Sequence, residues 1–217
     1  MLYITGLIAL KKIAVLVSGG GTNLQALIDA ESDGIIKNGE ITLVISSRPG
    51  VYALERAEKA GIKSIVLERK KYALQADFDA DLLDALKEHD IDLVVLAGFL
   101  TILGDTVISE YKNRIINVHP SLIPSFCGKG FYGLKVHEAA LSRGVKLTGA
   151  TVHLVNEIAD GGPILMQRAV EVMDDDTPET LQKRVMRECE HVLLPLAVSK
   201  FCEDKITVKG NIAVINP

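Results

Sequence analysis

The alternation of short apolar runs with segments of helical spacing constrains the fold more than any other feature of the sequence. Residues 12–17 form an apolar, β-branched run that ends in a Ser-Gly-Gly-Gly turn, and residues 23–28 then show helical spacing. The same pair of patterns recurs three times, as strands near residues 41–45, 64–67 and 93–96 and helices over 52–60, 77–89 and 105–111. This order predicts parallel strands joined by right-handed crossovers.

The second half of the chain departs from this alternation. A fifth strand near residues 114–118 leads into a loop over 120–133, and a connection of that length inside a compact domain is usually functional. The remaining patterns predict a helix over 136–143, strands over 147–155 and 164–172, a long helix from 176 toward 201, and a hairpin over 206–215. We predict an α/β fold with an open, mostly parallel, twisted, Rossmann-like sheet, helices on both faces and antiparallel additions toward the C-terminus.

A length of 217 residues predicts a single domain, with a nucleotide-binding-like half over residues 12–120 and a second half over 121–217. Residues 1–11 form an N-terminal extension. Its apolar run at 2–10 is too short to span a membrane, and its positive charges follow the run, unlike those of a signal peptide. We interpret this run as a strand or tether that covers an edge.

Composition excludes several classes of function. With 24 Lys and Arg against 28 Asp and Glu, the net charge of −4 argues against nucleic acid or an anionic membrane as partner. Cys127, Cys189 and Cys202 form no CxxC pair, so neither a disulfide framework nor a zinc site is indicated, and a reducing cytoplasm is the expected location. No two of the five histidines are spaced i,i+4 as a metal pair, and we predict no metal.

The glycine turn at residues 18–21 is a candidate anion site. Because it opens a helix, several backbone N–H groups would converge at the positive end of the helix dipole, an arrangement that binds phosphate. Leu24 stands where a third glycine would complete a dinucleotide fingerprint, and no Gly-Lys-Ser/Thr ending marks a P-loop. A purely structural glycine turn explains these residues nearly as well.

A second candidate site lies at the end of the fifth strand, where alternation places Asn117 and His119 on one side. An amide beside an imidazole suits acyl-type chemistry, since one can stabilise an oxyanion and the other can exchange a proton. The alternative is a histidine that only hydrogen-bonds the following loop. Asp160 lies in a tight turn, where aspartate is common for local reasons, but it could orient His119 if the turn reaches this strand end. His153 would then face the same cleft.

Four segments together resemble one enzyme family. They read SGGGTNLQ at 18–25, LAGFL at 96–100, INVHPSLIP at 116–124, and TGATVHLV at 148–155 followed by DGGP at 160–163. Over about residues 12–201, in order and with compatible spacing, the chain resembles the phosphoribosylglycinamide formyltransferases (glycinamide ribonucleotide transformylases) of the folate-dependent formyltransferase family. The Asn-x-His pair with a distal Asp is specific to folate-dependent formyl transferases and hydrolases.

The resemblance implies a chemistry. It implies transfer of the formyl group of 10-formyltetrahydrofolate, the co-substrate, to the amine of 5-phosphoribosylglycinamide in purine biosynthesis. It also implies Asn117, His119 and Asp160 as the catalytic residues. His119, protonated with help from Asp160, and the Asn117 amide would stabilise the oxyanion, and water held by Asp160 would relay a proton to the departing folate nitrogen. A cytoplasmic monomer or homodimer is expected.

The resemblance also places both substrates. Gly21, Thr22 and Asn23 would hold the ribotide phosphate, and Gly98, Pro120 and Glu190 would contact the rest of the ribotide. The folate would lie against residues 100–103 and the turn at 156–160, using mostly backbone bonds and an apolar slot. The residues implied in folate binding are Leu100, Thr101, Ile102, Leu103, Asn117, Asn156, Glu157, Ile158, Ala159 and Asp160.

This chain departs from the family pattern at Gln75 and Thr101, where relatives carry arginine, and its loop over 125–133 is longer than elsewhere in the family. Formyltetrahydrofolate hydrolase shares the catalytic residues but differs in its loop and has an N-terminal regulatory domain. Methionyl-tRNA formyltransferase would need a C-terminal nucleic-acid-binding domain. A non-catalytic ribotide-binding module is the alternative from another class.

Overall fold

The computed structural model describes residues 9–217 and contains one seven-stranded sheet in the order β3-β2-β1-β4-β5-β6-β7. Strands β1 to β5 pair in parallel, and β6 and β7 are added antiparallel. The sheet strands are β1 (Lys11–Val17), β2 (Gly39–Ser46), β3 (Lys63–Val66), β4 (Leu93–Leu96), β5 (Ile115–His119), β6 (Leu147–Leu154) and β7 (Ile164–Glu171). The predicted fold class is confirmed.

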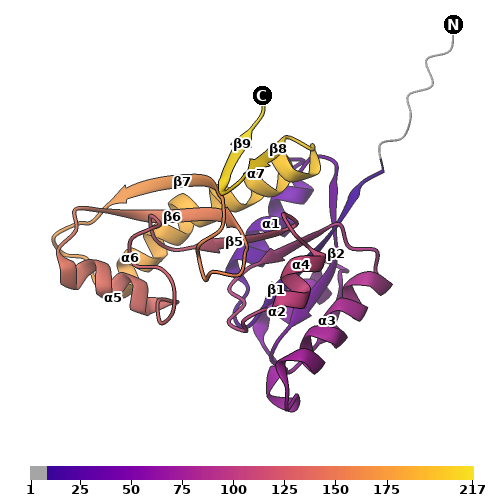
Figure 1. Cartoon of the computed structure of the whole chain (residues 1–217). Coiled ribbons are helices and arrows are strands. Elements are labelled where there is room, and N and C mark those ends of the chain that lie inside the picture. Colours follow the sequence, from indigo (N-terminus) through magenta and orange to yellow (C-terminus); the bar gives the residue numbers. More distant parts are fainter. Residues whose placement is uncertain (1–8) are drawn as a thin grey trace, which may run out of the picture.

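Helices cover both faces of this sheet (Figure 1). Helices α1 (Thr22–Ser32), α2 (Tyr52–Lys59), α5 (Leu134–Arg143), α6 (Pro178–Val185) and α7 (His191–Cys202) contribute to the core on one face. Helices α3 (Gln75–Glu88) and α4 (Asp105–Glu110) pack on the other face, and a short helix, η1 (Arg69–Lys71), precedes α3. The loop after β5 contacts the end of this strand, where the Phe126 carbonyl oxygen lies 2.9 Å from His119 Nε2.

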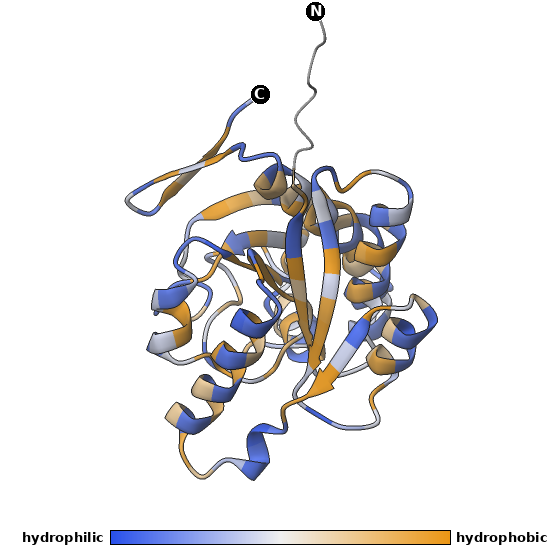
Figure 2. Ribbon diagram, turned by 90° about the vertical axis from the view of Figure 1, so that its right-hand side faces the viewer, coloured by the Kyte–Doolittle hydropathy of each residue, from blue (hydrophilic) through white to orange (hydrophobic). Residues whose placement is uncertain are grey.

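Strand β1 shows why the sheet forms. Ile13, Val15 and Val17 enter one core cluster, and Ala14 and Leu16 enter the other, and all five are 0% exposed. A strand buried on both faces needs a continuous apolar run, which the sequence supplies. Figure 2 shows such apolar stretches along the central strands.

The long C-terminal helix is the main difference from the sequence-based expectation. The start is as expected: the Thr177 hydroxyl accepts a hydrogen bond from Thr180 N (3.2 Å) in a capping box, with Pro178 in the first turn. However, a π-helical segment, η2 (Met186–Glu190), separates α6 from α7. Apolar spacing does not reveal such a segment, and π-helical turns often occur at functional sites.

The chain ends as predicted in a hairpin of β8 (Ile206–Lys209) and β9 (Ile212–Ile215), which pair antiparallel. The apolar run at residues 2–10, interpreted above as a strand or tether, falls almost wholly outside the described residues. Within residues 9–217, no helix has both the length and the apolar character needed to cross a bilayer.

Candidate active site

The carboxyl ends of β1, β4 and β5 meet at one edge of the sheet because these strands are neighbours and run parallel. The loops that follow β1 and β4 are joined there by hydrogen bonds. Leu100 N donates to Ser18 Oγ (2.9 Å), and Ser18 Oγ lies 2.6 Å from Ser47 Oγ after β2. These hydrogen bonds fix the glycine turn beside the segment that contains Gly98.

The glycine turn opens α1 without a capping side chain. Gly21, at φ 72°, is the N-cap residue, and its carbonyl accepts the Gln25 N–H (2.9 Å). Among the hydrogen bonds of residues 9–217, none is donated by the backbone N–H of Gly20, Gly21, Thr22 or Asn23. Free donors at the positive end of a helix are suited to bind an anion.

Glu190 lies next to this turn although it comes from the distant π-helical segment. Its carboxylate accepts a hydrogen bond from Asn23 Nδ2 (2.7 Å), and the side chain is buried. Burial raises the pKa of Glu190, and the Asn23 amide offsets part of that effect. Its position in the last long helix alone leaves Glu190 either at the surface or behind the site, and the structure buries it against Asn23. A buried carboxylate with spare acceptor capacity is suited to hydroxyl groups of a ligand.

Asn117 and His153 form the first pair at the end of β5. Asn117 Nδ2 lies 3.1 Å from His153 Nε2, and His153 Nδ1 lies 2.8 Å from the Leu154 carbonyl oxygen. Since a carbonyl only accepts, Nδ1 of His153 carries a hydrogen, and its Nε2 faces both Asn117 Nδ2 and, at 3.6 Å, Asp160 Oδ1. The amide nitrogen of Asn117 has a second N–H, which remains available to a ligand.

His119 and Asp160 form the second pair. His119 Nδ1 lies 3.6 Å from Asp160 Oδ2, and Nε2 lies 2.9 Å from the Phe126 carbonyl oxygen. Both ring nitrogens therefore face oxygen acceptors, so a doubly protonated imidazolium can donate to each. His119 does contact the following loop, as the alternative interpretation required, but it also meets Asp160.

Asp160 is placed to remain ionised. Burial opposes its ionisation, but the neighbouring His153 and His119 rings and a hydrogen bond from Gly128 N (2.7 Å) outweigh burial and hold its pKa below the usual value. The Gly128 contact also joins the turn that carries Asp160 to the loop over residues 120–133. The carboxylate is thus a fixed negative charge between two histidines.

His137, in the first turn of α5, also belongs to this neighbourhood. The side chain is wholly buried, and within the described residues neither ring nitrogen has a hydrogen-bond partner. Burial and the charge of His119 lower the pKa of His137 to about 4. His137 is therefore a neutral group at neutral pH, packed near the catalytic candidate.

The loop over residues 120–133 is anchored by a buried threonine. The Thr151 hydroxyl donates to the Ser121 carbonyl (2.7 Å) and accepts from Ile123 N (3.0 Å) and Gln167 Nε2 (2.9 Å). These bonds tie the first residues of the loop to β6 and β7. The start of the loop is therefore held in place, and the loop directs Phe126 O and Gly128 N toward the site.

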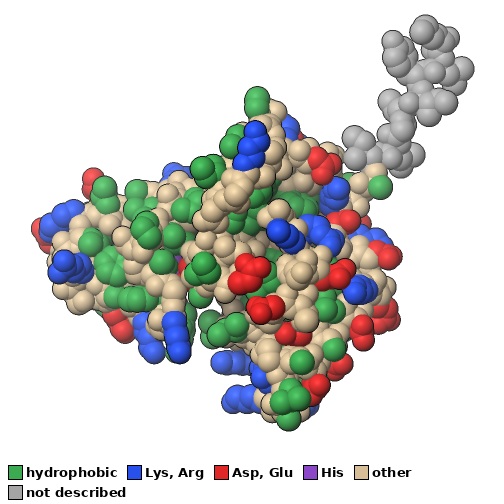
Figure 3. Space-filling view, viewed as in Figure 1, with side chains coloured by type: hydrophobic (Ala, Val, Ile, Leu, Met, Phe, Trp, Pro, Cys, Tyr) green, Lys and Arg blue, Asp and Glu red, His purple; other side chains and the backbone are tan. Residues whose placement is uncertain are grey.

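The two segments expected to hold the folate, residues 100–103 and 156–160, carry apolar side chains that are exposed to solvent at some positions. Leu100, Ile102 and Ile158 are 52%, 82% and 67% exposed, whereas Leu103 is buried at 6%. Gln75 Nε2 donates to the Ile102 carbonyl (3.1 Å), so it supports this segment by neutral hydrogen bonding. Figure 3 shows the molecule hollowed between the part with α5 and the part with α3, with Lys and Arg side chains on both sides.

The structure brings Asn117, His119, Asp160 and His153 together and joins Asn23 to Glu190. Gly98, at φ 71°, and Pro120 lie on the loops that leave β4 and β5 at the same edge. No contact joins the exposed segment at residues 100–103 to the turn at 156–160 among the described hydrogen bonds. Within residues 9–217, no cluster of three His, Cys, Asp or Glu side chains is arranged to hold a metal.

Comparison with known proteins gives one consistent result. A family model described as "Formyl transferase" matches residues 11–198. The chain is 38% identical to the phosphoribosylglycinamide formyltransferase of Haemophilus influenzae, covering 95% of this chain and 94% of that one. It is 43% identical to the trifunctional purine biosynthetic protein adenosine-3 of Drosophila melanogaster over 87% of this chain, which spans only 14% of that protein. The crystal structure of glycinamide ribonucleotide transformylase 1 from Symbiobacterium toebii superposes with a TM-score of 0.91 at 39% identity, covering 100% and 98% of the two chains.

Proposed function

The chain belongs to the formyl transferase family, and we propose that it transfers the formyl group of 10-formyltetrahydrofolate to the amine of 5-phosphoribosylglycinamide. The products are formylglycinamide ribotide and tetrahydrofolate, and the reaction is a step of purine biosynthesis. One observation carries this proposal: Asn117, His119 and Asp160 meet at the same sheet edge as a glycine turn with unpartnered N–H groups.

The ribotide is held from its phosphate end. Gly21, Thr22 and Asn23 bind the phosphate through the free N–H groups at the start of α1. Glu190 accepts hydrogen bonds from the sugar, and Gly98 and Pro120 contact the rest of the molecule. This arrangement extends the ribotide from β1 past the end of β4, with its amine directed toward β5.

The chemical step is an attack of this amine on the formyl carbon. The carbonyl oxygen gains negative charge, and the Asn117 amide and the protonated His119 ring stabilise it by hydrogen bonds. Asn117 can do so because His153 occupies only one of its two N–H groups. Asp160 places its negative charge beside this ring, with Oδ2 3.6 Å from His119 Nδ1.

Collapse of the tetrahedral intermediate requires a proton on the departing folate nitrogen. The attacking amine passes its proton to a water molecule held by Asp160, the water passes a proton to the folate nitrogen, and the bond between the formyl carbon and that nitrogen breaks. The ionised state of Asp160 suits this role, because a carboxylate accepts a hydrogen bond from water and orients it. The formyl group ends on the ribotide amine.

The folate lies against the segment from Leu100 to Leu103 and the turn from Asn156 to Asp160, where Glu157 and Ala159 contribute backbone groups. Thr101 and Ile102 are part of the first segment, and Ile158 supplies an exposed apolar surface on the second. Leu103 is buried, so it acts through its backbone. Asn117 borders both substrates, as a group that binds the transferred formyl oxygen must.

A spectrophotometric assay with 10-formyltetrahydrofolate, with and without 5-phosphoribosylglycinamide, tests the proposal, with mass spectrometry of the ribotide. Folate release that depends on the ribotide and yields its formylated form is the expected result. Release without ribotide, accompanied by formate, would identify a formyltetrahydrofolate hydrolase. Ribotide binding without any release would indicate a binding module. The cytoplasmic location and the choice between monomer and homodimer stay predictions.

A further inference from the structure

Helix α2 fastens the glycine turn through the carbonyl groups of the turn. Ala53 N donates to the Gly19 carbonyl (3.2 Å), and Arg56 Nε donates to the Gly20 carbonyl (2.9 Å). The contact is close, because a Cβ atom added to Gly21 would lie 2.7 Å from Ala53 Cβ. The second and fifth residues of α2 therefore set the position of the turn.

These two bonds also decide where the N–H groups of the turn point. In a trans peptide the C=O and the following N–H point in opposite directions. Holding the carbonyls of Gly19 and Gly20 against α2 therefore turns the N–H groups of Gly20 and Gly21 away from α2. Both N–H groups are without an acceptor among the described residues. The bond from Arg56 thus acts on the peptide whose N–H belongs to Gly21.

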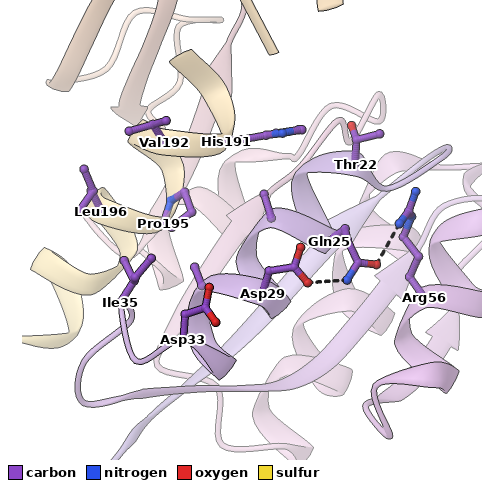
Figure 4. Close-up of a pocket in the computed structure, with 12 residues that line it drawn as sticks. Thr22, Gln25, Asp29, Asp33, Ile35, Arg56, His191, Val192, Pro195 and Leu196 are labelled. Atoms are coloured by element: carbon purple, nitrogen blue, oxygen red, sulfur yellow. Dashed lines mark hydrogen bonds between the residues drawn. The ribbon is translucent and has the colours of Figure 1, made fainter. Parts of the chain in front are cut away.

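Arg56 itself is held from three sides. Its Nη1 donates to Gln25 Oε1 (2.8 Å), Gln25 Nε2 donates to Asp29 Oδ1 (2.8 Å), and the guanidinium lies over the Tyr52 ring at 4.8 Å from its centroid. Figure 4 shows the chain of hydrogen bonds from Arg56 through Gln25 to Asp29 along the outer side of α1. Arg56 is half-buried, and the Gly20 carbonyl and the Gln25 side chain each accept a hydrogen bond from its guanidinium.

Residues 18–25 contain no lysine or arginine. Among the described hydrogen bonds, Arg56 is the one cationic side chain that donates to the turn over residues 18–23. The proposed phosphate site therefore receives its charge from the helix dipole and from a cation placed behind the turn. An arginine whose only role was to attach α2 to α1 would not need to contact the turn.

We propose that Arg56 is a positioning residue for the ribotide phosphate. It fixes the peptide between Gly20 and Gly21 so that the Gly21 N–H faces the phosphate, and it places a positive charge directly behind the turn. This inference rests on the proposed function of the turn. It concerns the affinity for the ribotide alone, because Arg56 contacts no residue of the trio Asn117, His119 and Asp160.

Steady-state kinetics of Arg56→Ala test the proposal. We expect the KM for 5-phosphoribosylglycinamide to rise roughly tenfold, the effect of one charge-assisted hydrogen bond, with kcat within about twofold. The KM for 10-formyltetrahydrofolate stays unchanged, and the inhibition constant of inorganic phosphate, competing with the ribotide, rises in parallel. Arg56→Lys, which keeps the charge but not the two-sided hydrogen bonding, recovers part of the loss.

Lys59→Ala is the matched control, because it removes one positive charge from the exposed side of the same helix without touching the turn. An unchanged ribotide KM in Arg56→Ala overturns the proposal. So does a loss shared by kcat and both KM values, because that pattern indicates a general structural defect. If the unmodified protein shows no ribotide-dependent activity, the proposed function fails instead. Calorimetry with inorganic phosphate on the unmodified protein and on Arg56→Ala then still tests the role of Arg56.

Discussion

The two ends of the candidate active site are built in different ways. The proposed phosphate end is made of backbone groups. It consists of the N–H groups of residues 20–23, in one short turn that α2 holds from behind. The formyl end consists of side chains from β5, β6 and the turn after β6, and Asn117 meets His153 across 36 positions of the sequence. The first is fixed by local conformation, and the second depends on the assembled sheet and the loop that covers it.

This difference predicts which amino-acid substitutions each end can tolerate. A site made of N–H groups is insensitive to the side chains it presents but sensitive to any atom that moves the backbone. A site made of side chains loses its function when a single side-chain group is removed, even though the backbone around it stays in place. The two ends should therefore respond to opposite kinds of substitution, one with a defect in binding and one with a defect in turnover.

The largest effect is expected at the formyl end. His119→Ala removes a hydrogen-bond donor and a stabilising charge from the developing oxyanion, and kcat should fall by roughly 10³-fold or more, while the dissociation constant of the ribotide stays unchanged. Pre-steady-state turnover and calorimetry on the same preparation measure the two quantities. His89→Ala, at the far end of α3, is the control. Unchanged turnover in His119→Ala would refute the assigned mechanism.

At the phosphate end, Gly21→Ala should give the opposite pattern. Its Cβ would lie 2.7 Å from Ala53 Cβ, so the turn must shift, and the ribotide KM should rise by roughly 100-fold with little change in kcat, as for the loss of two charge-assisted bonds. Gly34→Ala is the matched control, because Gly34 has a similar φ of 69° with open space around it. That control costs stability of about 1 kcal/mol through backbone strain but leaves the ribotide KM intact. Equal KM values in the two variants would contradict the backbone account of this end.

The sequence predicts the parts of each end that are contiguous in the chain, and it misses the parts that tertiary packing brings in. A strand, a glycine turn and a helix are contiguous, so local patterns reveal them, and strand alternation correctly places Asn117 and His119 on one side. The burial of Glu190 depends on a π-helical segment that apolar spacing does not reveal. The role of Arg56 depends on how α2 packs against the turn, and on a sequence it looks like any exposed helical arginine.

The burial of His137 likewise depends on tertiary structure, and it makes the formyl end sensitive to acid. Its pKa is lowered from 6.5 to about 4, so the unfolded chain takes up a proton first as the pH falls below about 6.5, and this lowers the free energy of unfolding down to about pH 4. At pH 5 the loss attributable to His137 should be about 2 kcal/mol.

His137→Leu removes this titration, so denaturant unfolding at pH 7 and pH 5 should show a smaller drop for the variant than for the unmodified protein. Asp160, with its lowered pKa, and Glu190, with its raised pKa, titrate in both proteins, so their contributions cancel in the difference. Parallel pH profiles for the two proteins would show that His137 is not the cause.

The smallest effect is expected in the turn that carries Asp160. This is the part of the formyl end where, as at the phosphate end, backbone conformation sets the geometry. Asn156 Oδ1 accepts from Ile158 N (3.1 Å) and its Nδ2 donates to the Gly161 carbonyl (3.3 Å), so its side chain shapes the backbone from inside the turn. Asn156→Ala should lower kcat and raise the folate KM by about threefold each, as for the loss of two weak neutral hydrogen bonds. Asn211→Ala removes a bond to the same Gly161 carbonyl (3.2 Å) from the outer hairpin and should leave both constants unchanged. Equal losses in the two variants would mean that the hairpin, and not the turn itself, positions Asp160.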